Sequence, residues 1–134
     1  MERVSGIATP TSILRSIHIP LKLTNSNTGR GHARYAKAND RADIERLLLS
    51  LNLRETPLEF PVALHLTRYL AKGERLWDMD SGLRGNAKEL IDSLVAIGWF
   101  HDDSPRWISE VRFFQDNSQR NIGGMLLQLV LQHQ

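Results

Sequence analysis

The sequence predicts an α+β domain, in which a mixed four-stranded sheet carries two helices in the order strand, helix, strand, helix, strand, strand. Four segments alternate apolar and polar residues with a period of two, which is typical of strands. Two other segments repeat apolar residues every three or four positions, as one-sided helices do. At 134 residues and 41% apolar composition, we expect residues 1–134 to form a single domain, with residues 1–12 loose.

The first strand is expected over Ile13 to Leu23, where the odd positions are apolar and Ser16, His18 and Lys22 face the other way. The other three strands follow from the same alternation. Their apolar phases are Phe60, Val62, Leu64 and Leu66, then Trp107, Val111 and Phe113, and finally Met125, Leu127, Leu129 and Leu131. Residues 115–124 are rich in Asn, Ser and Gly, and we interpret them as the loop of a closing hairpin.

The helical period appears from Tyr35 to Leu51 and again from Ala87 to Ile97. The apolar sets are Ile44, Leu47, Leu48 and Leu51 in the first helix, and Ala87, Leu90, Ile91, Leu94 and Val95 in the second. Gly98 stands where a left-handed C-cap is expected, and Asn52 with Pro57 ends the first helix. We expect both helices to cover one face of the sheet.

Composition limits the classes of function. The formal charge of +2 and a pI near 9.3 mildly favour an anionic partner. The absence of cysteine excludes disulfides, thiolate zinc sites and cysteine nucleophiles, and it fits a reducing compartment. No apolar run approaches the roughly 18 residues that span a bilayer, and the first residues lack a signal-peptide pattern. We therefore expect a soluble cytoplasmic protein.

Two acidic groups flank the second helix. Asp78-Met79-Asp80 lies between the second strand and that helix, and Asp102-Asp103 lies in the turn that follows it. Carboxylates at both ends of one helix are a candidate site for a divalent metal that acts on phosphate. A helix over residues 86–97 would hold its ends about 18 Å apart, so one metal requires the flanking turns to fold back. The alternative is that these residues cap the helix or are solvated in turns.

These acidic residues belong to a longer pattern. It comprises Asp78-Met79-Asp80, then Lys88-Glu89-Leu90-Ile91-Asp92-Ser93-Leu94, then Gly98-Trp99-Phe100-His101-Asp102-Asp103-Ser104. The pattern resembles the signature of the RusA family of Holliday junction resolvases, the crossover junction endodeoxyribonucleases. The Gly123-Gly124 pair before an alternating strand is also similar to the end of that family's chains. The resemblance is specific over residues 78–108, plausible over the last thirty residues and weak before residue 55.

The resemblance implies a RusA-like domain and a small homodimeric endonuclease that nicks opposed strands of four-way DNA junctions with Mg²⁺, in DNA recombination and repair. It makes Asp78, Asp80 and Asp103 the metal-binding carboxylates and Lys88 the essential basic residue. Mg²⁺ prefers oxygen ligands and keeps several waters, so two or three carboxylates suffice. Asp102 is expected only to shape the turn. The alternatives are a catalytically degenerate RusA-like DNA-binding module, or a structural or interaction protein without nuclease activity.

The chain departs from the family pattern after Asp80. The family's Asn is Ser81 here, and about four extra residues lie between Asp80 and Lys88. Gly82 and Gly85 favour a loop, since each costs a helix interior roughly 1 kcal/mol relative to alanine, and a loop leaves Lys88 in the catalytic position. If the insertion extends the helix instead, Arg84 takes that position. The alternative for Lys88 is an exposed helix cation paired with Asp92.

Four further basic residues are spaced at intervals of four, three and four residues: Arg30, Arg34, Lys37 and Arg41. A helix that starts early enough displays them as one stripe, which together with Arg84 suits sequence-independent contacts to DNA phosphates. The alternative is an ordinary solvated face with Arg41 paired to Glu45. Three tryptophans, at 77, 99 and 107, could stack on bases but more often belong to a core or a dimer interface. His101 is a candidate ligand or general base, whereas His18 and His65 are expected to be sheet residues with satisfied ring nitrogens.

Overall fold

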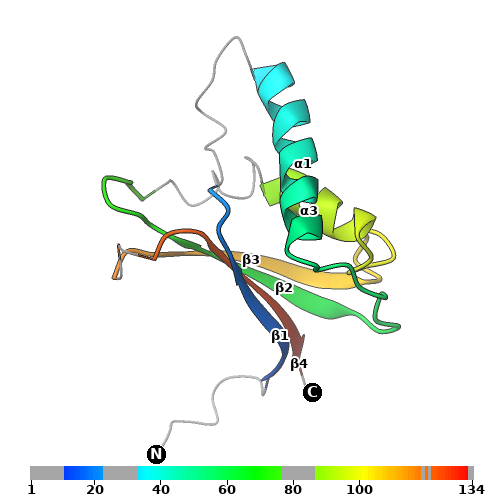
Figure 1. Cartoon of the computed structure of the whole chain (residues 1–134). Coiled ribbons are helices and arrows are strands. Elements are labelled where there is room, and N and C mark those ends of the chain that lie inside the picture. Colours follow the sequence, from blue (N-terminus) through cyan, green and yellow to red (C-terminus); the bar gives the residue numbers. More distant parts are fainter. Residues whose placement is uncertain (1–10, 23–32, 77–86, 119, 121, 133–134) are drawn as a thin grey trace, which may run out of the picture.

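The computed structural model describes residues 11–22, 33–76, 87–118, 120 and 122–132, with the backbone alone for residues 11, 33–40 and 132 (Figure 1). Its elements are β1 (Thr11–Ile19), α1 (Ala33–Ser50), β2 (Val62–Tyr69), α3 (Ala87–Ala96), β3 (Ile108–Asp116) and β4 (Met125–Gln132). The order and the α+β class confirm the prediction.

The four strands form one mixed sheet in the order β1-β4-β2-β3. β4 pairs antiparallel with both β1 and β2, and β2 pairs parallel with β3. The carboxyl ends of β1, β2 and β3 therefore meet at one edge, which we call the carboxyl edge. Both helices lie on the same face of the sheet, as expected (Figure 1).

The core lies between the helices and that face. Alternation along β2 and β4 points one set of apolar residues at the helices. Each helix in turn packs its own apolar side against these residues. Buried members include Leu64 and Leu66 of β2, Leu127 and Leu129 of β4, Ile44 and Leu48 of α1, and Leu90 and Leu94 of α3. Burying a side chain of this size contributes roughly 1.5–3 kcal/mol. Leu51, which was expected on the buried stripe, is 40% exposed because it follows the last residue of α1.

Both helices end in the same motif. In α3, Gly98 has φ 99°, and the backbone N–H groups of Gly98 and Trp99 donate to the carbonyls of Val95 and Leu94. In α1, Asn52 has φ 61° with the equivalent two bonds. These are Schellman caps, in which a left-handed residue turns the chain and satisfies the last carbonyls. The predicted ends of both helices are confirmed.

β1 differs from its prediction in two ways. It begins at Thr11, which pairs with Gln132, so residues 11 and 12 are not loose; residues 1–10 lie outside the described residues. A register shift between Ile13 and Arg15 also reverses the faces, so that Ile13 is 59% exposed whereas Ile19 is fully buried. The extra residue of a β-bulge has this effect. The expected uninterrupted phase over residues 13–23 is therefore wrong at its start, and the strand ends at Ile19.

The expectation of a closing hairpin is wrong. β4 does not pair with β3; it lies between β1 and β2. The burial pattern supplies the physical reason. β2 and β4 carry the most completely buried apolar phases, whereas Val111 and Phe113 of β3 are only partly buried. Placing the two most apolar strands at the centre of the sheet and β3 at its edge buries more apolar surface.

Candidate functional site

Lys88 lies in the first turn of α3, which places it on the solvent side of the helix while Leu90 and Leu94 face the core. Its side chain is 66% exposed, and its Nζ is 3.8 Å from Asp92 Oδ1, one turn along the helix. This is the ion pair that is expected if Lys88 is only an exposed helix cation. Such an exposed pair contributes only about 0.3–0.5 kcal/mol, so it leaves the ammonium group accessible to an anion. Arg84, the other candidate for this position, lies outside the described residues.

The acidic doublet lies in the turn after α3. Trp99 and Phe100, which are almost completely buried, fix the start of this turn. Asp102 Oδ1 accepts a hydrogen bond of 2.8 Å from the Ser104 N–H. Hydrogen bonds from the Ser104 hydroxyl and backbone N–H hold the pKa of Asp102 below its usual range. The expected role of Asp102 in shaping the turn is confirmed. Asp103 is exposed to solvent.

Two neighbours of the doublet are already engaged. His101 Nε2 lies 2.7 Å from Glu59 Oε2, and the His101 ring packs on Trp107 with centroids 4.5 Å apart. That nitrogen is therefore occupied by a carboxylate. Trp99 is 1% exposed, and its indole Nε1 donates to the Leu53 carbonyl at 2.7 Å. The core role expected of the tryptophans is thus confirmed for Trp99; Trp77 lies outside the described residues.

The two sheet histidines differ. His18 Nε2 is 2.7 Å from the Gly123 carbonyl oxygen, so its expected satisfied state is confirmed. His65 Nε2 is buried without a hydrogen-bond partner, 4.0 Å from Glu110 Oε1. Burial and the nearby Arg112 charge lower the pKa of His65, against the opposite pull of Glu110. The expectation of a satisfied residue is therefore wrong for His65, whose environment favours the neutral ring.

The described residues do not bring Lys88 and Asp103 together. Lys88 is at the start of α3, and Asp103 is beyond its end, beside the start of β3. α3 has ten residues and is about 15 Å long. Asp78 and Asp80 lie outside the described residues. Within the described part of the chain, no three His, Asp, Glu or Cys side chains gather closely enough to hold a metal ion.

The structure describes only part of the predicted basic stripe. α1 begins at Ala33 and therefore carries positions 34, 37 and 41, whose spacing of three and four puts them along one side of the helix. Arg41 is exposed. Arg30 lies outside the described residues. The positions thus suit a stripe on α1, with its first member ahead of the helix.

A second basic group was not anticipated from the sequence. Arg68 occupies the phase of β2 that otherwise faces the core, and it is only 5% exposed. Its Nη1 donates to the Arg75 carbonyl at 3.0 Å and to Gln115 Oε1 at 2.8 Å, and its Nη2 lies 3.8 Å from Glu74 Oε2. The signal available in the sequence was a charged residue where the alternation of Leu64 and Leu66 favours an apolar one.

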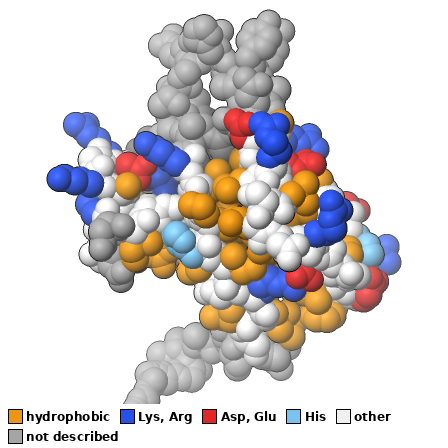
Figure 2. Space-filling view, viewed as in Figure 1, with side chains coloured by type: hydrophobic (Ala, Val, Ile, Leu, Met, Phe, Trp, Pro, Cys, Tyr) orange, Lys and Arg blue, Asp and Glu red, His pale blue; other side chains and the backbone are white. Residues whose placement is uncertain are grey.

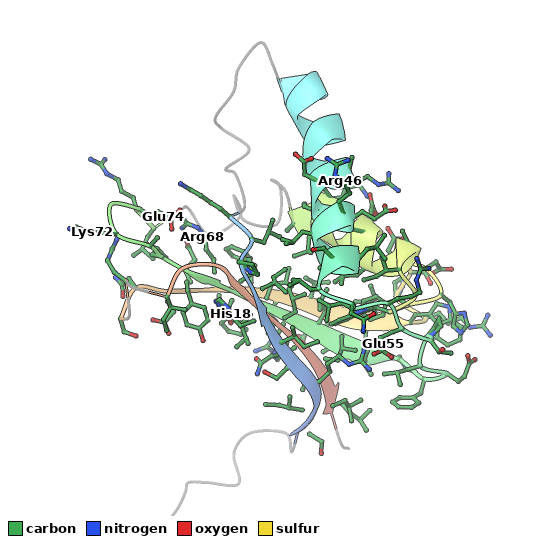
Figure 3. All side chains as sticks on the ribbon, viewed as in Figure 1. His18, Arg46, Glu55, Arg68, Lys72 and Glu74 are labelled. Carbon is green, nitrogen blue, oxygen red and sulfur yellow. The ribbon has the colours of Figure 1, made fainter. Side chains whose placement is uncertain are left out.

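Glu74 is the centre of this second group (Figure 3). Its carboxylate accepts a hydrogen bond of 2.6 Å from the Ala71 N–H and lies 3.5 Å from Lys22 Nζ. Burial raises the pKa of Glu74, but the Ala71 hydrogen bond and the Arg68 and Lys22 charges outweigh it, and the pKa lies below its ordinary value. The Arg120 guanidinium donates to the carbonyls of Ala71 and Glu74. Segments that follow β1, β2 and β3 are thereby joined at the carboxyl edge.

Neither a scan against known protein families nor a search of curated proteins finds a match to this chain. Within the described ranges, no helix is both long and apolar enough to cross a membrane.

Proposed function

We propose that the chain is a Mg²⁺-dependent endonuclease that acts on four-way DNA junctions as a homodimer. The observation that carries the proposal is the ordered set Asp78, Asp80, Lys88 and Asp103 around one helix, within an α+β order of elements that suits a RusA-like chain. The two residues of the second doublet also differ in a way that supports the proposal. Asp102 accepts a hydrogen bond within the turn, whereas Asp103 is exposed to solvent.

The types of donor fit magnesium. Asp78, Asp80 and Asp103 supply only oxygen ligands, which Mg²⁺ prefers, and the ion needs one or two protein carboxylates because it keeps several waters. When bound, the ion would activate a water and hold the scissile phosphate. Lys88, exposed at the start of α3, would contribute positive charge to the phosphate oxygens, where charge accumulates during the reaction.

Asp103 lies beyond the far end of α3, so the proposed metal site requires Asp80 to reach it from the other end of the helix. Asp78 follows Leu76 by two residues, so its Cα lies within about 7 Å of the Leu76 Cα. Asp80 precedes Ala87 by seven residues, a reach of about 23 Å, which exceeds the about 15 Å length of α3. The length of the segment between Asp80 and Ala87 is therefore compatible with a site formed by Asp80 and Asp103 of one copy. Otherwise Asp103 completes the site of the second copy in the homodimer.

The test is nicking of a labelled four-way junction with Mg²⁺ by three matched variants. Asp80→Asn and Asp103→Asn are expected to lower the cleavage rate at least about 100-fold, since each removes a charge that stabilises the transition state. Asp102→Asn removes the same charge one residue away and is expected to keep most of the activity. Equal losses for Asp102→Asn and Asp103→Asn, with all variants folded, would show that the doublet acts only through its turn.

A mixture of two inactive variants distinguishes a site formed within one copy from a site shared between the two copies. If Asp103 serves the other copy, a mixture of Asp80→Asn and Asp103→Asn chains forms mixed dimers with one intact site, and nicking returns. If each copy is self-sufficient, the mixture stays inactive. Both results fit an endonuclease, and they decide which copy supplies Asp103.

A second candidate function is a DNA-binding module without catalysis. The observation that favours it is that Lys88 and Asp103 lie at opposite ends of α3. Junction binding that persists in the absence of metal, with no nicking in Mg²⁺ or Mn²⁺, would support this candidate over the endonuclease.

A further inference from the structure

We propose that the carboxyl edge of the sheet is a docking surface for the phosphate backbone of DNA, separate from the predicted stripe on α1. The surface, which we call the edge patch, consists of Lys22 after β1, Arg68 at the end of β2, Lys72 and Arg75 in the following turn, and Arg120 after β3. The inference rests on the proposed function in taking DNA as the polyanion.

Hydrogen bonds hold the turn that carries part of the edge patch. Arg68 and Arg120 both hold the turn 71–75, the first through the Arg75 carbonyl and the second through those of Ala71 and Glu74. Just before this turn, the Tyr69 N–H donates to the Gly124 carbonyl and the Leu70 N–H to the Asp116 carbonyl, which ties the end of β2 to the end of β3 and to the start of β4. The backbone of this turn is thereby held in place, while the Lys72 and Arg75 side chains are exposed to solvent.

Charge at this edge is strongly one-sided. The edge patch has five basic side chains, and the acidic side chains described beside them are Glu74 and Asp116. Glu74 is 13% exposed, and its Oε2 lies 3.8 Å from Arg68 Nη2 and 3.5 Å from Lys22 Nζ, so it is a counter-ion to both. The exposed basic groups are then Lys22, Lys72, Arg75 and Arg120. Blue side chains project from this end of the molecule in Figure 2, and Lys72 points outward in Figure 3.

The shape of the surface favours an extended backbone over a small ligand. The pocket at this edge has a volume of about 50 Å³ and is lined by Leu21, Lys22, Arg68, Tyr69, Ala71, Glu74 and Gly124. That volume holds a few waters and falls well below the roughly 300–1,000 Å³ of small-molecule sites. Exposed cations around a pocket of this size suit phosphate contacts that carry no sequence information.

The position suits the proposed reaction as well. The chain leaves the edge patch at Leu76 and reaches Asp78 two residues later. The edge patch and the first carboxylate of the proposed metal site are thus close together along the chain. The edge patch would position the DNA arm, and Lys88 would serve the scissile phosphate.

The test measures junction binding without metal, so that it does not depend on cleavage. Fluorescence anisotropy from 50 to 250 mM NaCl compares the wild type with Lys72→Ala/Arg75→Ala. The matched control is Arg46→Ala/Arg54→Ala, which removes the same charge from exposed residues outside the edge patch. Each phosphate contact contributes about 0.9 to the slope of log K against log[salt]. We expect the edge-patch variant to lose about 1.8 from this slope and roughly 10-fold or more in affinity, and the control to lose little of either.

An unchanged slope in the edge-patch variant, or an equal loss in the control, would overturn the proposal. So would a wild type that fails to bind junction DNA at 50 mM NaCl. A variant that binds DNA normally but no longer binds vesicles containing phosphatidylserine would assign the edge patch to a lipid surface and also overturn it. A wild type that binds through the edge patch but never nicks would refute the endonuclease while leaving this surface in place.

Discussion

Gly98 is a residue whose identity is fixed by both its backbone angle and its surroundings. Its φ of 99° lies in the left-handed region, and a Cβ there would overlap the carbonyl oxygen of Glu55. That approach is part of the structure, because the Glu55 N–H donates to the Ile97 carbonyl at 2.9 Å. Gly98 thus joins the end of α3 to the segment that leads into β2.

The comparison of Gly98→Ala with Gly73→Ala separates these two effects. Gly73 has φ 87°, and no atom lies within 4 Å of the position that an alanine methyl group would take, so alanine there costs only the left-handed conformation, about 1–2 kcal/mol. Gly98→Ala adds the clash and is expected to cost at least about 3 kcal/mol. Urea unfolding measures both. Equal losses would mean that the segment at Glu55 moves aside freely.

The turn that follows β2 depends on the charge of Glu74. The pKa of this carboxyl is lower in the folded chain than its ordinary value of 4.5. The carboxylate therefore contributes stability that is fully present above pH 4.5 and is lost as the pH falls through the folded pKa.

Glu74→Gln tests this dependence. The variant keeps a group that can accept the Ala71 hydrogen bond but loses the charge facing Arg68 and Lys22. We expect the wild type to be more stable by about 1–2 kcal/mol at pH 7, and the difference to decrease as the pH falls below 4.5 and through the folded pKa of Glu74. Urea midpoints between pH 3 and pH 7 provide the measurement. A difference that is independent of pH would show that the charge of Glu74 does not stabilise the turn.

Elements whose residues alternate or repeat cleanly could be predicted from the sequence. The helix ends were predictable as well, because Gly98 and Asn52 carry local signals for a left-handed cap. The bulge in β1 was not, since Ile13 and Leu14 are both apolar and either could face the core. The position of β4 was missed because adjacency in sequence favours a hairpin with β3, whereas burial favours the centre of the sheet.

The candidate site was predictable to a different degree at each residue. The role of Asp102 follows from the short-range chemistry of an Asp two residues before a Ser N–H, and the structure confirms it. The edge patch was missed because its members come from segments after three different strands, which only the topology brings together. The roles of Asp78, Asp80, Lys88 and Asp103 stay predictions.

At the scale of the whole molecule, both helices cover one face of the sheet (Figure 1). The net charge of +2 is unevenly distributed, because five basic side chains gather at the carboxyl edge while acidic residues lie in the turn after α3. A surface divided in this way suits an enzyme that must hold a polyanion and bind a cation in the same complex.

Mapping of nicks on an end-labelled, immobile four-way junction incubated with the purified wild-type chain and Mg²⁺ tests the proposed endonuclease most directly. The proposal predicts paired nicks at symmetric positions in two opposed strands, with no product in EDTA or with Asp80→Asn. A chain that is folded and binds the junction, yet leaves all four strands intact in Mg²⁺ and in Mn²⁺, would contradict it.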